Sequence, residues 1–340
     1  MGASSYFIDS VLEVMTLQLK HPQPRIHGGP DAAGAARFDF STNSNACGPC
    51  RAALAAVQLA DATQYPDASY TALRVQLAVF HGVDVQRVVL AASASEFIFR
   101  ITAMVAGRGG RSVSLPPHSY GDYAHAAAAH GLEVVEAHVA DLCWACEPSS
   151  PLGSAHADWH SASRAVRVLD RAYEPLRLSG AFAHAGDLDK LWQLYSPNKA
   201  LGLTGVRAAY AIAPLDSATD IDTVNQLCPS WPIGAHGVAM LEAWTQPETQ
   251  SWLASSLATL RQWKIQQIEL CESMGWMVLP SLANFFVCRA DIDLAALRQH
   301  GIKLRDCTSF GLANHVRISV QPPATQDALH NAWLQIQGMK

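Results

Sequence analysis

Short apolar runs alternate with amphipathic segments along the first two thirds of the chain. Residues 87–91 (RVVLA) form a continuous run of β-branched and apolar residues, which is typical of a strand buried on both faces. A group of small residues follows, and residues 96–106 then carry an apolar face at helical spacing. This alternation predicts an α/β domain with a mostly parallel sheet. Strands are expected at 38–40, 87–91, 112–115, 132–139, 164–169 and 206–212, and helices at 51–60, 70–81, 96–106 and 122–130.

The pattern changes after Pro214, where helical segments dominate. Residues 248–274 predict one long helix, and helices also lie between and after several short apolar runs. The short strands expected here are 276–279, 284–288, 302–305 and 316–320. This arrangement suits a smaller α/β domain with an antiparallel sheet.

The length of 340 residues allows one large domain or two smaller ones. We expect an N-terminal arm that joins the small domain over 1–50, a large ligand-binding domain over 51–245 and a small domain over 246–340. Residues 1–20 predict an amphipathic helix rather than a signal peptide, because acidic residues interrupt the apolar positions.

Composition and charge narrow the class of partner. The net charge is −5, 49% of the residues are hydrophobic, and lysine and arginine form no long run. Nucleic acid and an anionic membrane surface are therefore not expected as partners, and no apolar run reaches membrane-spanning length. We expect a cytoplasmic protein with a small-molecule substrate.

Four polar residues fall at or just after the ends of predicted strands. They are Ser93, Ser119, Asp170 and Lys199. Ligands of open α/β sheets collect at the carboxyl ends of the strands, so these side chains are expected to converge on one site.

Lys199 lies in a mostly uncharged stretch, SPNKALGLTGVRAAY, over 196–210. A lysine removed from water loses part of its preference for the charged form, and its amine can then attack an aldehyde to give a Schiff base. Ser196 and Arg207, on either side of it, suit a phosphate group. The alternative for an isolated lysine is a solvated surface position.

Asp170 ends a predicted buried strand and is followed by Tyr173. A buried carboxylate is costly unless it meets a cation or a hydrogen-bond donor, and a protonated pyridine nitrogen would be such a partner. Tyr173 would donate to a phenolate oxygen on the same ring. A strand-end aspartate that caps the next turn is the alternative.

Together these motifs resemble the class I and II aminotransferases, which are pyridoxal-phosphate enzymes of fold type I. The resemblance covers nearly the whole chain and is greatest to the branch of histidinol-phosphate aminotransferases and cobalamin-pathway threonine-phosphate decarboxylases. The matching stretches are FSTNSN (40–45) with GP (48–49), YPD (65–67), AASASE (91–96), PHSY (117–120), DRAY (170–173), SPNK (196–199) with Arg207, LRDCTSF (304–310) and RISV (317–320).

The resemblance implies a large domain whose mostly parallel sheet is of the seven-stranded type, a small α/β domain, and pyridoxal 5′-phosphate as cofactor. Lys199 would hold the cofactor as a Schiff base and shuttle the substrate proton. Asp170 would keep the ring nitrogen protonated, Tyr173 would bond the ring hydroxyl, and Tyr120 would stack on the ring. No metal ligand is expected.

The resemblance also implies the groups that hold the anions. For the cofactor phosphate they are Ala94, Ser95, Ser196 and Arg207, with Tyr65 reaching over from the second subunit of a homodimer. For the substrate they are Arg317, aided by Asn45, at the carboxylate and Arg305 at a distal phosphate or acid.

The chain departs from the family pattern in the loop that follows the cysteine pair at 143–146. EPSSPLG (147–153) stands where the family usually has NPNNPTG, so Ser150 replaces the asparagine that bonds the ring hydroxyl. Other departures are Ala91 and Ser93 for glycines, Asn198 for a hydroxyl residue and Arg171 for an acid.

Several functions stay open at this point. The first is an aminotransferase for a small amino acid or amino alcohol with an anionic tail, and the second is a threonine-phosphate decarboxylase on the same scaffold. A third is a protein that kept the fold and lost catalysis. A fourth rests on two C-x-x-C pairs, 47–50 and 143–146, which have the spacing of zinc or redox cysteines, although free thiols are the simpler interpretation.

Overall fold

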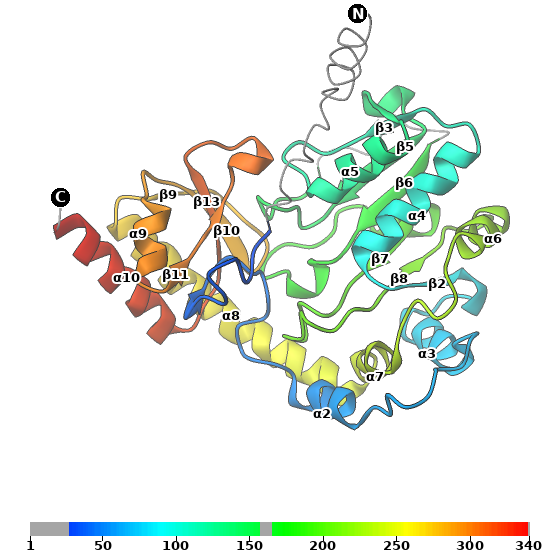
Figure 1. Ribbon diagram of the computed structural model, residues 1–340, viewed down its shortest axis with the longest axis horizontal. Helices are drawn as coiled ribbons and strands as arrows, with labels where there is room; N and C mark the ends of the chain where they lie inside the picture. Colours follow the sequence, from blue (N-terminus) through cyan, green and yellow to red (C-terminus); the bar gives the residue numbers. More distant parts are fainter. Residues whose placement is uncertain (1–26, 157–164, 339–340) are drawn as a thin grey trace, which may run out of the picture.

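The computed structural model describes residues 27–156 and 165–338, which form two lobes, each built on its own sheet (Figure 1). The helix expected at residues 1–20 lies outside the described residues. Within the described part, none of the helices is both long enough and apolar enough to cross a membrane.

The larger lobe contains a seven-stranded sheet in the order β2-β8-β7-β6-β5-β3-β4. Only β8 runs antiparallel to its neighbours, so the expectation of a mostly parallel sheet is confirmed. The strands are β2 (Val88–Ala91), β3 (Ser112–Ser114), β4 (Glu133–Val134), β5 (Leu142–Cys146), β6 (Val166–Asp170), β7 (Trp192–Tyr195) and β8 (Ala209–Ile212).

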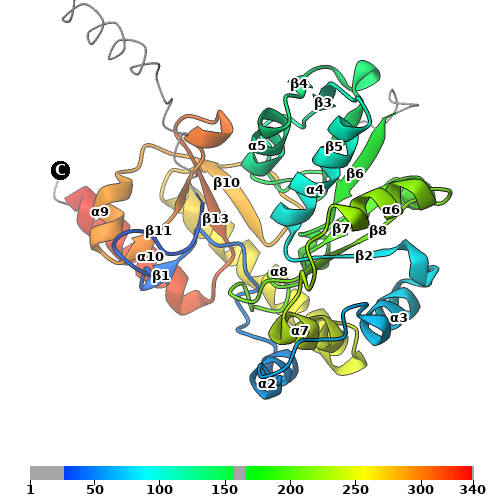
Figure 2. The same cartoon turned by 45° about the vertical axis from the view of Figure 1, so that its right-hand side comes forward.

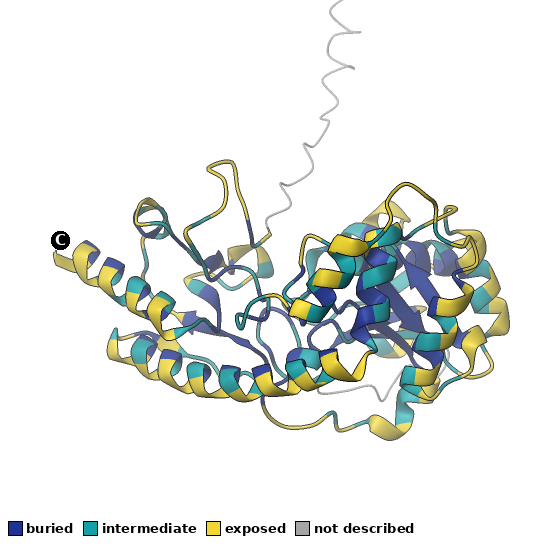
Figure 3. Cartoon of the chain, turned by 90° about the horizontal axis from the view of Figure 1, so that it is seen from below, coloured by how far each residue is buried: buried dark blue, intermediate teal, exposed yellow. Residues whose placement is uncertain are grey.

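Helices cover both faces of this sheet because successive strand residues point to opposite faces and most of them are apolar. Val89 and Ala91 of β2 belong to the core under one set of helices, whereas Val88 and Leu90 belong to the core under the other. Figure 3 shows the buried strands of the large sheet between helices whose outer faces are exposed. The first set is α4 (Ala94–Gly107), α5 (Gly121–Ala129) and α6 (Ala218–Gln226), and the second is α2 (Arg51–Leu59), α3 (Thr71–His81) and α7 (Ala235–Trp244).

The smaller lobe contains an antiparallel sheet in the order β12-β13-β10-β9, as expected for the C-terminal part. Its strands are β9 (Met277–Val278), β10 (Phe285–Arg289), β12 (Arg305–Asp306) and β13 (His315–Ser319). Helices α9 (Leu294–Gln299) and α10 (Pro323–Gly338) complete the lobe, and α8 (Pro247–Ser273) runs from α2 and α7 to β9 and α10 (Figure 2). The exact domain boundaries given above remain predictions.

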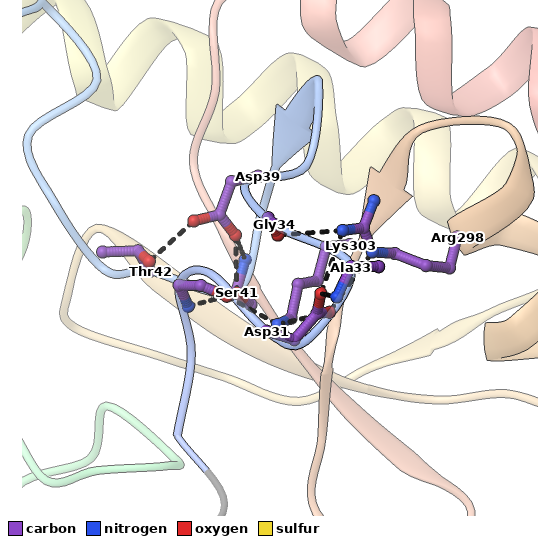
Figure 4. A network of polar contacts seen from close by, with 9 residues as sticks. Asp31, Ala33, Gly34, Asp39, Ser41, Thr42, Arg298 and Lys303 are labelled. Atoms are coloured by element: carbon purple, nitrogen blue, oxygen red, sulfur yellow. Dashed lines mark hydrogen bonds and ion pairs between the residues drawn. The ribbon is translucent and has the colours of Figure 1, made fainter.

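The N-terminal segment pairs with the far end of the chain. Strand β1 (Phe38–Asp39) lies parallel to β11 (Ile302–Lys303). Asp31 bridges Arg298 (3.0 Å) and Lys303 (2.9 Å), and the bond to Arg298 above all holds the pKa of Asp31 well below its usual range (Figure 4).

Asp39 fixes the turn that follows β1, because its carboxylate accepts hydrogen bonds from the Ser41 amide and hydroxyl (Figure 4). Short 3₁₀ helices occupy, among other connections in the described residues, Val85–Arg87, Ala137–Val139, Glu174–Leu176, Ala185–Lys190 and Thr308–Phe310.

Two expected strands differ from the structure, and one strand of the structure was not expected. The strand expected over 132–139 is limited to β4, and the following residues form a 3₁₀ turn. Residues 142–146, considered above only for their cysteines, form β5, whose five residues are all buried in the middle of the sheet. The expected strand 302–305 is divided between β11 and β12, which belong to different sheets.

Candidate active site

A cavity of about 720 Å³ lies where the carboxyl ends of β6 and β7 face the small sheet and the N-terminal segment. Most of the expected site residues line it. They are Ala94, Ser95, Tyr120, Ser150, Asp170, Tyr173, Ser196, Lys199, Arg207, Arg305 and Arg317. The convergence predicted from the strand ends is therefore found for Asp170 and Lys199.

Lys199 follows β7 in a tightly bonded loop. Its carbonyl oxygen accepts from the amides of Asn45 (2.9 Å) and Gly202 (3.2 Å), and its side chain is half-buried. The amine nitrogen lies 5.2 Å from the centre of the Tyr173 ring. These hydrogen bonds fix the position of the Lys199 backbone, and the side-chain amine faces the cavity.

Asp170 is buried at the end of β6 and uses both of its oxygens. Oδ2 accepts from the Tyr123 hydroxyl (2.7 Å), and Oδ1 accepts from the amide of Ala172 (2.9 Å). Burial raises the pKa of Asp170, while the Tyr123 bond is the strongest influence that opposes the increase. A positive partner in the cavity would favour the ionised carboxylate further.

Donors suited to a phosphate gather at the start of α4 and after β7. Ser93 caps the helix by accepting from the Glu96 amide (3.1 Å), and the amides of the first turn carry the positive end of the helix dipole. The Ser95 hydroxyl is 3.1 Å from the Tyr120 hydroxyl. Arg207 makes no ion pair with any residue that the structure describes, so its charge is available to an anion.

Arg305 and Arg317 are cross-strand partners on β12 and β13 and are both buried. The guanidinium of Arg317 donates to the Ser150 hydroxyl (3.0 Å) and to the Ser41 carbonyl (2.9 Å), and its Nε has no partner within 27–156 and 165–338. Burial and the Arg317 charge lower the pKa of Arg305. Two adjacent buried guanidinium groups favour the binding of an anionic ligand.

Two expected site residues lie outside the cavity wall. The Asn45 amide donates to the Ala200 carbonyl (3.1 Å) and the Ser256 hydroxyl (2.8 Å), so it is committed to packing beneath the lysine loop. Tyr65 is 79% exposed and stacks on Trp231 with ring centres 4.6 Å apart. Among the described residues, no side-chain hydrogen bond or ring contact joins Tyr65 or Asn45 to the other expected site residues.

The structure adds residues to which the sequence analysis gave no role. Asn43 lines the cavity and donates to the Tyr173 hydroxyl (3.3 Å), and Tyr123 holds Asp170. Asn43 lies in the FSTNSN stretch, which could have drawn attention to it, whereas nothing in the sequence links Tyr123 to Asp170.

The cysteine pairs show no sign of metal or redox chemistry. All eight cysteines are free thiols, and in the described parts of the chain no group of three or more potential ligands could hold a metal ion. Burial raises the pKa of Cys47 and raises that of Cys143 to about 11, so neither thiol favours the reactive thiolate.

The lysine, the buried aspartate and the basic groups that line one cavity define the class of enzymes that bind an anionic aldehyde cofactor on an α/β sheet. The chain belongs to the class I and II aminotransferase family, whose model matches residues 37–335. It is an enzyme, and pyridoxal 5′-phosphate is its cofactor.

The chain is 27% identical over 320 residues to histidinol-phosphate aminotransferase 1 of Thiobacillus denitrificans, covering 83% of this chain and 80% of the relative. Two solved structures share the fold. Histidinol-phosphate aminotransferase from Sinorhizobium meliloti, in complex with pyridoxal 5′-phosphate, gives a TM-score of 0.74 at 21% identity, covering 88% and 90% of the two chains. L-threonine-O-3-phosphate decarboxylase from Porphyromonas gingivalis gives 0.64 at 22% identity, covering 84% and 93%.

The donor set of the cavity fits this cofactor. An amine faces the same space as a buried carboxylate, an aromatic ring and an arginine without an ion pair in the described chain. These groups match the aldehyde, the ring nitrogen, the ring face and the phosphate of pyridoxal 5′-phosphate, respectively.

Proposed function

We propose that the chain is an aminotransferase of the histidinol-phosphate aminotransferase type, acting on a small amino acid or amino alcohol with an anionic tail. The observation that carries the proposal is the second cationic wall of the cavity. Arg207 lies in the loop before β8 of the large sheet, whereas Arg305 and Arg317 lie on β12 and β13 of the small sheet. One wall serves the cofactor phosphate, and the other serves the anionic part of the substrate.

The cofactor phosphate would be held by the amides of Ala94 and Ser95, the Ser196 hydroxyl and Arg207. Tyr120 would lie on the face of the ring, and Tyr173 would donate to the ring hydroxyl. Asp170, which is buried and held by Tyr123, would meet the ring nitrogen as an ionised carboxylate.

When bound, the cofactor supplies an electron-withdrawing ring that stabilises negative charge on the substrate carbon. The chain supplies the proton transfer and the orientation. The Lys199 amine takes the proton from that carbon and passes it to a second atom. Arg317 and Arg305 fix the orientation of the substrate through its anionic groups. The bond held perpendicular to the ring is the one broken, so this orientation decides between transamination and loss of carbon dioxide.

The test is to load the purified protein with pyridoxal 5′-phosphate and record its visible absorbance. The unchanged protein is expected to show a visible band, and Lys199→Ala is expected to lose it. Lys190→Ala is the matched control, because Lys190 is exposed and pairs only with Asp187 within the described chain. A band that persists in Lys199→Ala would contradict the role of that lysine.

Substrates then separate the two reactions. Histidinol phosphate with 2-oxoglutarate is expected to give glutamate, and threonine phosphate is expected to release no carbon dioxide. Release of carbon dioxide from threonine phosphate without a keto product would replace the aminotransferase by the decarboxylase. Loss of the visible band in every preparation would favour the catalytically inactive alternative.

We also propose a homodimer in which Tyr65 serves the cofactor phosphate of the second subunit. Its exposed ring supports the proposal, since it contacts only Trp231 among the aromatic rings described. Tyr65→Ala and Lys199→Ala homodimers should each have low activity. Mixing them after mild dissociation should restore up to about a quarter of the activity, because mixed dimers contain one complete site. No recovery in mixed dimers would contradict the shared site.

A further inference from the structure

Ser150 is already committed to an arginine. Its hydroxyl accepts from Nη1 of Arg317 at 3.0 Å, and the residue is buried. A serine side chain has one oxygen and is shorter than the asparagine that the family usually has at this position. Ser150 therefore keeps contact with the substrate arginine and has no amide to offer to the cofactor ring.

Asn43 contacts the hydroxyl of Tyr173. Its amide nitrogen is 3.3 Å from the Tyr173 hydroxyl, its side chain is only 1% exposed, and the residue lines the cavity. Its Oδ1 atom is buried with no partner among the residues that the structure describes. Leaving one polar atom of a buried amide without a hydrogen bond costs free energy. Packing alone therefore does not explain why Asn43 occupies this position.

The loop that carries Asn43 is fixed from both sides. The side-chain amide of Asn284 donates to the Ser44 carbonyl (3.1 Å), and the backbone amide of Asn45 donates to the Lys199 carbonyl (2.9 Å). Asn43 is therefore held in a constant relation to Tyr173 and to the lysine loop.

We propose that two residues share the work of the missing asparagine: Asn43 directs the hydroxyl proton of Tyr173 toward the cofactor's ring hydroxyl, and Ser150 orients Arg317. A hydroxyl that accepts a hydrogen bond is a better donor, because successive hydrogen bonds polarise one another. With Asn43 donating to its oxygen, Tyr173 gives its own proton to the ring oxygen and stabilises the ionised form of that oxygen. Asn43 and Ser150 are positioning residues, since each acts through a neighbour.

This inference rests on the cofactor site proposed above and needs no substrate, so it is tested in the pyridoxal-phosphate-loaded protein by titrating the visible band with pH. Asn43→Ala is expected to raise the pH midpoint of the band change by roughly 0.5–1 pH unit, because the ionised ring oxygen loses part of its stabilisation. Ser44→Ala is the matched control in the same loop, since no side-chain hydrogen bond of Ser44 is found in the described chain, and it should leave the midpoint unchanged.

Action through Tyr173 is tested by a double-mutant cycle. Tyr173→Phe should raise the midpoint at least as far as Asn43→Ala, and adding Asn43→Ala to Tyr173→Phe should produce no further change. Additive shifts in the double variant would overturn the proposal, as would an unchanged midpoint in Asn43→Ala. Thermal unfolding of each variant shows whether it is folded, and the spectrum itself shows that it is loaded.

Ser150→Ala separates the two halves of the proposal. It should leave the midpoint unchanged and weaken the binding of inorganic phosphate to the loaded protein by about two- to tenfold, measured by calorimetry, because Arg317 loses an acceptor. A midpoint shift in Ser150→Ala as large as that of Asn43→Ala would show that Ser150 reaches the ring and would refute the division of roles. If the visible band forms but its pH midpoint does not change in the variants as stated, this inference alone is refuted. If the unchanged protein shows no visible band, the cofactor site itself is refuted.

Discussion

Tyr123 counteracts the effect of burial on the pKa of Asp170. Its hydroxyl donates to Oδ2 at 2.7 Å in a fully buried setting, and it opposes the effect of burial, which raises the pKa of Asp170. Without that donor the buried carboxylate holds its proton to higher pH.

Tyr123→Phe is therefore expected to move the acidic limb of the kcat profile upward by roughly one pH unit. The measurement is kcat against pH for the loaded enzyme. Tyr70→Phe is the control, because that hydroxyl is also buried but donates to the Ile233 carbonyl, away from the cavity. Equal shifts in both variants would show that the effect is a general loss of stability.

For single residues, the sequence predicted those whose position follows from the local pattern of strands. Lys199 and Asp170 could be predicted because each follows an apolar strand, and strand ends converge on one edge of a sheet. Tyr123 and Asn43 could not be found in this way, because their partners are 47 and 130 positions distant and the contacts exist only after packing. The roles expected for Tyr65 and Asn45 depend on which residues lie beside them in the folded protein, and sequence motifs do not specify these neighbours.

Gly202 controls how the lysine loop packs on the loop over 45–50. Its φ of +70° is in the left-handed region, and a Cβ there would lie 2.8 Å from the Gly48 carbonyl oxygen and 2.9 Å from the Pro49 Cα. Both clashing atoms belong to the backbone, so neither can turn aside.

Gly202→Ala should lower the free energy of unfolding by about 1–3 kcal/mol and weaken cofactor binding, because the Gly202 amide also bonds the Lys199 carbonyl. Urea denaturation and cofactor titration measure the two effects. Gly205→Ala, three positions along the same loop, has open space for a Cβ and should change neither. A Gly202→Ala variant as stable as Gly205→Ala would contradict the close packing.

The longest helix was predicted well, whereas elements with mixed sequence signals were not. The long helix α8 differs from its expected span by one residue at each end. Strand β5 was missed because LCWAC attracted attention as a cysteine pair, although a short apolar run is also the pattern of a central parallel strand. The division of β11 from β12 depends on which sheet each half joins, which local pattern does not encode.

The folded molecule as a whole carries a pH sensitivity at the half-buried His81. His81 on α3 lies 2.8 Å from the Tyr210 hydroxyl of β8, which also accepts from Trp244 of α7 at 3.0 Å. Burial, with a smaller contribution from Arg171, lowers the pKa of His81 from 6.5 to about 4. The unfolded chain therefore binds this proton at higher pH than the folded chain does.

The stability due to the neutral imidazole is full above pH 6.5 and is lost as the pH falls toward 4. The loss is roughly 2–3 kcal/mol. His81→Gln should reduce the difference in unfolding free energy between pH 7 and pH 4.5 by about that amount, measured by urea denaturation at both values. The exposed His138→Gln should not. The same pH dependence in both variants would exclude His81 as the cause.

The pairing of β1 with β11 also affects when, during synthesis of the chain, the cavity can fold. Ser41, which accepts from Arg317, precedes it by 276 positions, and Ser319 donates its amide to Phe40. A ribosome releases the amino end first, so the segment around Ser41 emerges long before the strands that it needs. The large sheet can assemble during synthesis, but the cavity closes only when almost the whole chain has been translated, and until then the early segment is exposed to chaperones and proteases.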